Sequence, residues 1–190
     1  MKKFLLLFFF SASVAAVSAQ HRVSYGVKAG INVSQIYNKF AQDGSDLRCA
    51  PVAGAFVGYR FADGRLGVQA EVLYSGRGGR YGSRARAYDY IDVPLLLKVK
   101  LWKGLDLNAG GQYGYLFNAQ EKVKDAKPQA ITDARRHEFS AVGGLSYDIT
   151  EHLFVDGRVV IGTMRLQDID VKNSKKLYSS TAALTLGLRF

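Results

Sequence analysis

The chain ends in Tyr178-Ser-Ser-Thr-Ala-Ala-Leu-Thr-Leu-Gly-Leu-Arg-Phe190, and in this stretch apolar residues alternate with small or polar ones. The apolar series is Ala182, Leu184, Leu186, Leu188 and Phe190. Because side chains of a strand point to opposite faces in turn, the pattern predicts a two-faced β-strand that runs to the last residue. A closed barrel must pair its last strand with its first, so a terminal strand of this kind indicates a β-barrel.

The other end of the chain favours export. Two lysines follow Met1, residues 4–10 are all apolar, and Val17-Ser-Ala19 offers small residues for cleavage. This is the pattern of a secretory signal peptide. It predicts that residues 1–19 are removed and that residues 20–190 form the barrel. No later segment is a continuous apolar helix, so a mature chain in a membrane would have to cross it as a barrel.

Composition limits the remaining possibilities. A mature chain of about 170 residues makes a single domain. Lys and Arg outnumber Asp and Glu by 26 to 16, which favours contact with anionic surfaces. Cys49 is the only cysteine, so the chain has no internal disulfide, and we expect this thiol to pack as a small apolar group or to sit free in a loop.

Seven further alternating segments precede the terminal one. They cover residues 23–36, 52–61, 66–77, 89–101, 105–117, 137–149 and 153–164. With the last strand they make eight, and bacterial single-chain barrels have an even number. The fold class that we predict is all-β: an eight-stranded antiparallel up-and-down transmembrane β-barrel with short periplasmic turns and longer extracellular loops.

Alternation alone does not say which face is outside, since a soluble lipocalin-like barrel would turn the apolar face inward. Segment length favours the membrane, because most segments exceed the ~5 to 6 residues of ordinary strands. The connections also alternate. Those at 62–65, 102–104 and 150–152 are tight, and those at 37–51, 78–88, 118–136 and 165–177 are long. Short turns on one side and long loops on the other are typical of outer-membrane barrels.

Outward aromatic residues gather near the strand ends, as membrane-interface girdles require. On the loop side we expect Tyr74, Tyr115, Phe117, Phe139 and Tyr178. On the turn side we expect Tyr25, Tyr59, Phe61, Tyr147 and Phe190. Pro94 is the exception to the pattern, because proline cannot donate to the strand ladder. We therefore predict a β-bulge near residues 92–94.

Four stretches also resemble a known family. They are Gln69-Ala-Glu-Val-Leu-Tyr-Ser75, Tyr90-Ile-Asp-Val-Pro-Leu-Leu-Leu-Lys98, Ala109-Gly-Gly-Gln-Tyr-Gly-Tyr115 and Asp156-Gly-Arg158. The chain resembles the PorT-like outer-membrane β-barrel family of Bacteroidetes. The resemblance implies an eight-stranded barrel in a Gram-negative outer membrane and a terminal Phe190 that the barrel-assembly machinery reads. The family's namesake is linked to protein export by the type IX pathway, which implies an accessory role in secretion as an alternative function.

Inward-facing charged residues are the main candidate site. By parity and depth we expect a polar network in the lumen, formed by Glu71, Lys98, Asp156 and Arg158. An eight-stranded barrel is just wide enough for side chains to fill it, and buried charges must be paired. Glu71 and Arg158 should meet across the lumen, and the network should act as a structural plug.

Basic residues near the predicted loops could contact anionic lipid head groups, including lipopolysaccharide. The candidates are Arg80, Arg84, Arg86, Lys122, Lys124, Arg135 and Arg136. The Arg/Gly-rich stretch 76–86 has the composition of a nucleic-acid-binding segment. In an exported protein we interpret it as a flexible basic loop and expect no nucleic-acid partner. Residues 43–46, Asp-Gly-Ser-Asp, are most simply an acidic turn.

A catalytic reading would need a nucleophile beside a base. The nearest candidates are His137 and Ser140, whose side chains fall on opposite faces by parity. We therefore expect no enzymatic activity, no cofactor and no metal. The leading hypothesis is a non-catalytic scaffold that displays extracellular loops for envelope integrity or for binding an unidentified protein partner. Secretion, a narrow pore and a lipid A-modifying enzyme are the alternatives.

Overall fold

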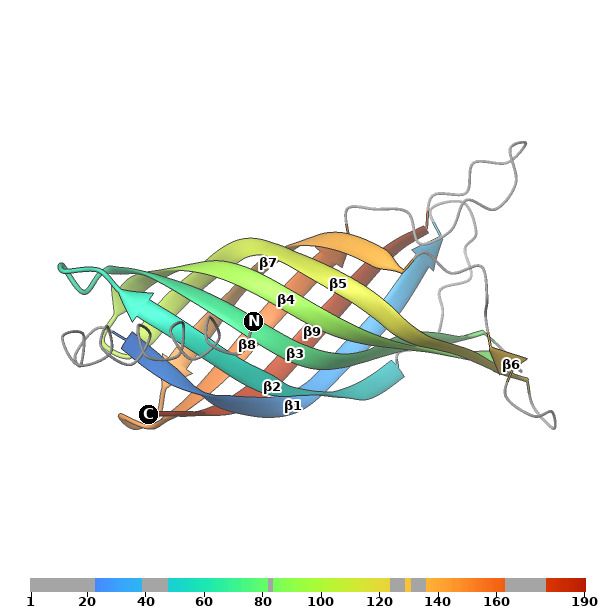
Figure 1. The fold of residues 1–190 in the computed structure, drawn as a ribbon, viewed down its shortest axis with the longest axis horizontal. Coiled ribbons are helices and arrows are strands. Elements are labelled where there is room, and N and C mark those ends of the chain that lie inside the picture. The colour runs from blue at the N-terminus through green and yellow to red at the C-terminus, as the bar shows by residue number, and fades with distance from the viewer. Residues whose placement is uncertain (1–22, 39–47, 82–83, 124–128, 131–135, 163–176) are drawn as a thin grey trace, which may run out of the picture.

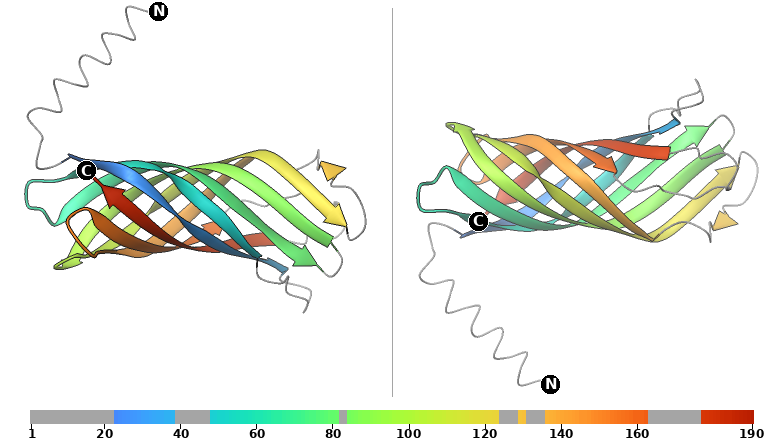
Figure 2. Two further views of the ribbon diagram at one scale, coloured as in Figure 1. Left: turned by 90° about the horizontal axis from the view of Figure 1, so that it is seen from below. Right: turned by 90° about the horizontal axis from the view of Figure 1, so that it is seen from above.

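The chain folds into one antiparallel sheet that closes on itself. The computed structural model describes residues 23–38, 48–81, 84–123, 129–130, 136–162 and 177–190. The strands are β1 (Val23–Asn38), β2 (Arg48–Arg60), β3 (Leu66–Tyr81), β4 (Arg84–Trp102), β5 (Leu105–Val123), β6 (Gln129–Ala130), β7 (His137–Asp148), β8 (Leu153–Gly162) and β9 (Leu177–Arg189). Neighbouring strands pair in chain order, and β1 pairs with β9 to close the ring (Figures 1 and 2).

The two-residue strand β6 pairs only with the far end of β5 and takes no part in the ring. The barrel is therefore eight-stranded and antiparallel, as the alternation predicts. Within the described residues, no helix is both long enough and apolar enough to cross a membrane.

The C-terminus lies in the seam of the barrel. Strand β9 pairs with β1 from Gly26 opposite Arg189 to Asn38 opposite Leu177. The backbone N–H of Phe190 donates to the carbonyl of Tyr25 at 2.8 Å, and the N–H of Tyr25 donates back at 3.3 Å. The last residue is thus held by the first strand, which confirms the prediction from the terminal pattern.

The apolar face of the sheet is outside and the polar face is inside. Leu186 is 52% exposed, whereas its neighbour Thr185 is 3% exposed. The same alternation runs through every strand of the ring, with leucine, valine, isoleucine and aromatic residues outward. A soluble lipocalin-like barrel would show the reverse, so the structure decides between the two arrangements in favour of a lipid-facing surface.

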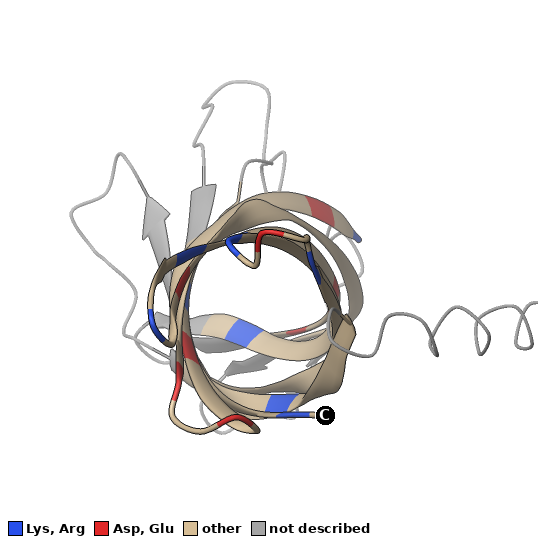
Figure 3. Cartoon of the chain, turned by 90° about the vertical axis from the view of Figure 1, so that its left-hand side faces the viewer, with Lys and Arg blue, Asp and Glu red and all other residues tan. Residues whose placement is uncertain are grey.

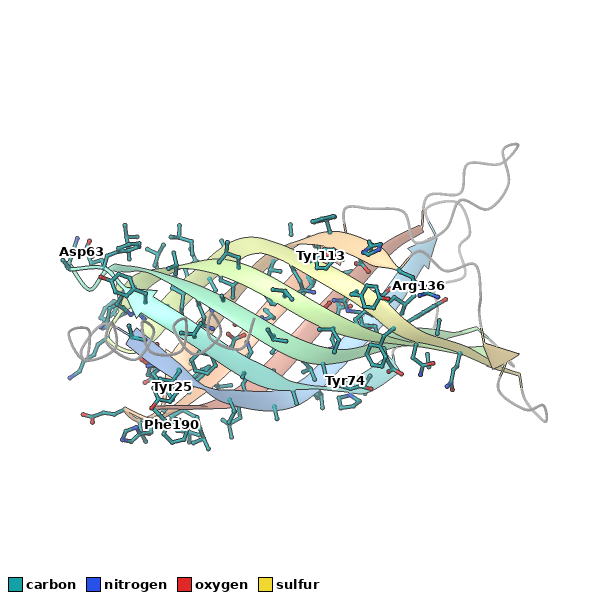
Figure 4. The ribbon with its side chains drawn as sticks, viewed as in Figure 1. Tyr25, Asp63, Tyr74, Tyr113, Arg136 and Phe190 are labelled. Carbon is teal, nitrogen blue, oxygen red and sulfur yellow. The ribbon has the colours of Figure 1, made fainter. Side chains whose placement is uncertain are left out.

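Aromatic rings gather at both ends of the outer face (Figure 4). At the turn end the ring of Tyr25 lies 6.2 Å from that of Phe190, and at the loop end Tyr74 lies 6.1 Å from Phe117. The other predicted girdle residues that the structure describes also point outward; the side chain of Tyr178 lies outside the described part. Trp102, which the pattern did not single out, is 76% exposed beside the β4–β5 turn and belongs to the turn-end girdle.

Three connections are tight, as predicted. Residues 61–65 join β2 to β3, residues 103–104 join β4 to β5, and residues 149–152 join β7 to β8. Gly64 and Gly104 adopt φ values of 65° and 82° in the first two turns. This left-handed conformation favours glycine because it has no Cβ to clash.

The predicted loop at residues 78–88 is wrong. Strands β3 and β4 continue as a paired hairpin as far as Tyr81 opposite Arg84, and β5 follows β4 up to Val123 opposite Arg84. These three strands project beyond the rest of the barrel (Figure 1). The Arg/Gly composition hid the strand, because glycine and arginine carry no apolar marker of alternation. Residues 78–81 and 84–88 are therefore extended sheet rather than a flexible loop.

The predicted bulge at residues 92–94 is also wrong. The β3–β4 register is the same on both sides of Pro94, with Ala70 opposite Leu95 and Leu73 opposite Asp92. Pro94 lies opposite Gln112 of β5 in an unbroken series, and the register shifts instead between Asp89 and Tyr90. The β3–β4 ladder lacks pairs only beside Pro94, where the missing N–H leaves a local gap in the bonding.

Two phenylalanines fill the lumen toward the turn end. Phe56 and Phe154 are 5% and 1% exposed, and their rings meet edge to face with centroids 5.4 Å apart. A Cβ on Gly187 would overlap the Phe154 ring, so the glycine makes room for that ring. Because the Phe154 ring packs against an inward glycine, the two rings fill the lumen here without widening the barrel.

The facing of β9 gives a first testable prediction. Leu186→Arg places a cation on the lipid face of β9, four residues from the girdle at Phe190, and should cost about 2 to 4 kcal/mol of unfolding free energy. Leu188→Arg is the matched control, because Leu188 lies on the same face near the turn end and its cost should fall to about 1 kcal/mol or less. Refolding titrations into vesicles measure both. Equal costs for the two variants would contradict the membrane placement.

Candidate functional site in the barrel lumen

Four charged side chains meet in the middle of the lumen. We call them the central cluster: Lys28, Glu71, Asp156 and Arg158. Arg158 donates from Nη1 and Nη2 to the two carboxylate oxygens of Glu71 at 2.9 and 3.0 Å. It also donates from Nε and Nη2 to Asp156 at 2.9 and 3.0 Å. Lys28 Nζ lies 2.7 Å from Glu71 Oε2.

The central cluster is neutral and fully enclosed. Two cations face two carboxylates, and the four residues are between 0% and 6% exposed. The bidentate fork of an arginine on a carboxylate is among the strongest hydrogen-bonded pairs in proteins, and it fixes both groups in orientation. The cluster therefore joins β1, β3 and β8 across the barrel interior.

Sequence alternation places these groups inside. Asp156 and Arg158 are two residues apart on β8, so both face the lumen, and Gly157 between them faces out. Gly144 of β7 lies opposite Arg158. A Cβ on Gly144 would come within 2.8 Å of the Arg158 Cβ, so this glycine leaves the arginine room to reach across.

A second group lies nearer the loop end. We call it the loop-end cluster: Arg77, Tyr90, Asp92 and Glu138. Arg77 pairs with Asp92 at 2.6 Å and with Glu138 at 3.3 Å, and its guanidinium lies 4.7 Å from the centre of the Tyr90 ring. All four side chains are buried, and Tyr90 is 2% exposed. An arginine over a tyrosine face adds cation–π attraction to the ion pairs.

The structure brings together three of the four lumen residues singled out from the sequence. Glu71, Asp156 and Arg158 are in contact, whereas Lys98 reaches Glu71 only through Gln69, whose Nε2 donates to Glu71 Oε1 at 2.6 Å. Lys98 donates to Gln69 Oε1 at 3.3 Å and lies 3.8 Å from Asp106 Oδ2. Arg60 also pairs with Asp106, so these residues form a separate group nearer the turn end.

Several contributors were missed. Lys28 lies on the inner face by parity, but parity does not give depth, and its register against β2 and β9 places it beside Glu71. Arg77 was assigned to the edge of a loop, and only the continued β3–β4 hairpin turns it into the lumen. Glu138 carries the alternation signal at the start of β7, which could have identified it.

The space between the two clusters is almost closed. A cavity lined by Lys28, Arg77, Asp92, Arg158 and neighbouring residues has a volume of about 10 Å³. A single water needs roughly 10 to 15 Å³. The central part of the described lumen is therefore filled by side chains, as expected for a barrel of eight strands.

The residues considered for catalysis point in different directions. His137 is exposed on the outer face, where its Nδ1 lies 2.6 Å from the Tyr113 hydroxyl and its ring stacks on that of Tyr113. Ser140 is buried in the lumen and donates to Glu138 Oε1 at 3.0 Å. No group of three or more His, Cys, Asp or Glu that could hold a metal ion occurs in the described part of the chain.

The predicted lipid-contact residues are described only in part. Arg80, Arg84, Arg86 and Lys122 lie on the projecting ends of β3, β4 and β5, and the backbone alone is described there. Arg136 is exposed immediately before β7 (Figure 4). Lys124, Arg135, residues 43–46 and the predicted signal peptide, residues 1–19, lie outside the described residues. Cys49 is a free thiol at an exposed position of β2.

Solved structures share this fold. Ail, the attachment invasion locus protein of Yersinia pestis, aligns with a TM-score of 0.56 at 14% identity and covers 89% of this chain and 99% of its own. A structure of Ail in complex with the heparin analogue sucrose octasulfate aligns with a TM-score of 0.54. Neisserial surface protein A aligns with a TM-score of 0.57 at 12% identity, over 87% of this chain and 97% of its own. At such identities the likeness shows the fold alone.

A comparison with curated protein sequences finds no match. A family model does match, over residues 12–166, and its description is outer membrane protein beta-barrel domain. The match spans most of the chain, and the closed ring with its lipid-facing exterior agrees with it. The chain belongs to the outer membrane protein beta-barrel domain family and is an outer-membrane β-barrel protein.

Proposed function

We propose that the protein is a non-catalytic anchor with a sealed lumen, which displays its loop end to partners at the cell surface. The observation that carries the proposal is the filled interior. The two charge clusters cross the lumen in succession, and the cavity between them holds about 10 Å³. A wall of paired side chains at that depth leaves no aqueous path for an ion, so the narrow pore is the weaker alternative.

The loop end is the surface that such an anchor presents. Its connections are residues 39–47, 82–83, 124–136 and 163–176, and β3, β4 and β5 project there beyond the rest of the barrel. Basic residues are frequent on these strand ends, among them Arg84 and Arg86. The structural neighbour Ail was crystallised with a heparin analogue, a polyanion. Both facts favour an anionic partner, and lipopolysaccharide phosphates are the nearest one to this surface.

Export and assembly complete the proposal. Residues 1–19 would direct the chain across the inner membrane and be removed. The barrel-assembly machinery would read the terminal strand through Phe190, whose exposed ring and backbone pairing mark the closing seam. Turns at 61–65, 103–104 and 149–152 would then face the periplasm and the long connections the exterior.

An accessory role in protein secretion rests on the PorT-like sequence resemblance. Deletion of the gene separates the two functions. Loss of secreted proteins with an intact envelope would favour secretion, whereas normal secretion with altered surface properties would favour the anchor. Altered lipid A acylation in the mutant, measured by mass spectrometry, would instead favour the enzyme alternative.

The sealed lumen predicts an electrically silent barrel. Purified protein reconstituted in planar bilayers should give no steady single-channel current, because the charge clusters block the centre. A known open porin in the same bilayers serves as the positive control. Steady stepwise conductance of the wild-type protein would contradict the sealed-anchor hypothesis and favour the narrow pore.

The central cluster should dominate barrel stability. Glu71→Gln leaves Arg158 and Lys28 with less compensation in a closed interior, and such a loss typically costs about 3 to 5 kcal/mol. The double variant Glu71→Gln/Arg158→Gln should recover part of that cost. Asp148→Asn is the matched control, because the Asp148–Arg189 pair is partly exposed and should contribute about 1 kcal/mol or less. Urea titrations of the refolded barrels measure all three, and a neutral Glu71→Gln would show that the lumen is wet.

The basic loop end should bind polyanions. Replacing Arg84 and Arg86 together by Ser should weaken lipopolysaccharide binding and reduce its salt dependence, because two cations are removed. Replacing Arg65 and Lys103, which lie at the turn end, is the matched control and should change little. Binding is measured at two salt concentrations in neutral detergent. An equal effect of both double variants would show that net charge, rather than the loop end, determines binding.

A further inference from the structure

The turn end of the barrel opens into a cavity that the anchor proposal does not use. Its volume is about 470 Å³, and it is lined by the ends of β1 to β4 and by the C-terminal strand. Figure 3 looks onto this end of the barrel. The charged residues that line it are all cations: Arg60, Lys98, Lys100 and Arg189.

Neighbouring carboxylates neutralise only part of this charge. Arg189 is balanced by Asp148, with Nη2 at 2.9 Å from Oδ1. Asp106 is shared by Arg60 and Lys98, and the Lys98 distance is 3.8 Å. For Lys100 no ion pair occurs among the described residues. Three cations therefore face one carboxylate there, which leaves an excess of two positive charges beside the cavity.

Two of these cations have unused donors. Nη1 of Arg60 is buried and has no hydrogen-bond partner in the described part of the structure. Lys98 is 6% exposed, and its Nζ donates to the neutral Gln69 amide at 3.3 Å and shares Asp106 with Arg60 at the longer distance of 3.8 Å. A buried cation that shares one carboxylate with a second cation is only partly compensated, which is costly. An anion in the cavity would satisfy both groups at once.

The cavity also has room and one neutral donor for such a ligand. Gly58 lines it, and a Cβ at this position would lie 3.0 Å from Ser24 Oγ and 3.7 Å from Gln69 Oε1. The Ser24 hydroxyl, which can donate, therefore faces the space above the glycine, whereas the Gln69 oxygen beside it accepts from Lys98. A side chain larger than glycine would occupy part of the cavity without changing its charge.

We propose that this turn-end cavity binds a phosphate group. Nη1 of Arg60 can donate to a phosphate oxygen while Nη2 keeps its contact with Asp106, and Lys98 and Lys100 add two point charges. A phosphate dianion also matches the excess of two positive charges. The group can come from a soluble phosphate or from a phospholipid head in the adjacent leaflet. This site is independent of the loop end, so its failure would leave the anchor proposal intact.

Calorimetric titration of the refolded barrel in nonionic detergent with inorganic phosphate tests the soluble source. We expect saturable binding that weakens about tenfold in Arg60→Gln and in Lys100→Gln, since each removes a charged contact. Gly58→Leu should weaken it at least as much with all charges kept. Lys103→Gln is the matched control, because Lys103 is a turn-end cation outside the cavity lining, and it should bind like the wild type.

Nanodiscs of phosphatidylcholine with and without phosphatidylglycerol test the lipid source, with retained lipid counted by native mass spectrometry. Selective retention of phosphatidylglycerol, lost in Gly58→Leu, supports the site and identifies a head group as its ligand. Heat-modifiable gel migration confirms that each variant is folded, and only folded variants are compared. Absence of saturable binding in both experiments overturns the proposal. It is also overturned if Lys103→Gln loses as much phosphate affinity as Lys100→Gln, or if Gly58→Leu binds like the wild type.

Discussion

The Arg158–Glu71 pair across the lumen is the contact on which the interior depends. Closing eight strands leaves an interior that only side chains can fill, and β3 and β8 face each other across it. The bidentate contact joins these opposite walls at 2.9 and 3.0 Å, and Lys28 and Asp156 balance it. Because the outer face meets lipid, the interior holds more buried polar and charged side chains than apolar ones, and the paired charges share it with a smaller apolar group that includes Phe56 and Phe154.

The same constraint arranges charge in layers along the barrel. The central cluster is neutral, whereas the loop-end cluster places one arginine against two carboxylates. The turn end has the opposite balance, with more cations than carboxylates among the described residues. The lumen therefore carries opposite local charge on the two sides of its sealed middle, whereas the basic residues of the loop end lie on the strand ends beyond the loop-end cluster. Any binding function must belong to one end or the other, because nothing larger than about one water fits between the clusters.

Glycines decide where large side chains can cross the lumen. Gly144 leaves room for Arg158, and Gly187 leaves room for Phe154. A Cβ at Gly144 would overlap backbone atoms of the neighbouring strand, and a Cβ at Gly187 would overlap the Phe154 ring. These glycines therefore belong to the interior packing rather than to turns. Glycines lie on the inner face next to the large side chains of Arg158 and Phe154, so a narrow barrel can hold both an ion-pair cluster and an aromatic pair.

Alternation of residue types in the sequence determined the eight strands and separated the two faces of each, because period two is a local property of each strand. The apolar pattern up to Phe190 predicted the closing role of the last strand. Segment length and the alternation of tight turns with long connections favoured lipid on the apolar face, which alternation alone leaves open. Tertiary structure decided depth and partners. Lys28 joins the central cluster and Lys98 leaves it, since the offset between strands, not parity, sets which residues share a level. The hairpin of β3 and β4 beyond residue 77 and the unshifted register at Pro94 likewise depend on neighbouring strands, whose hydrogen bonds no single segment of sequence reveals.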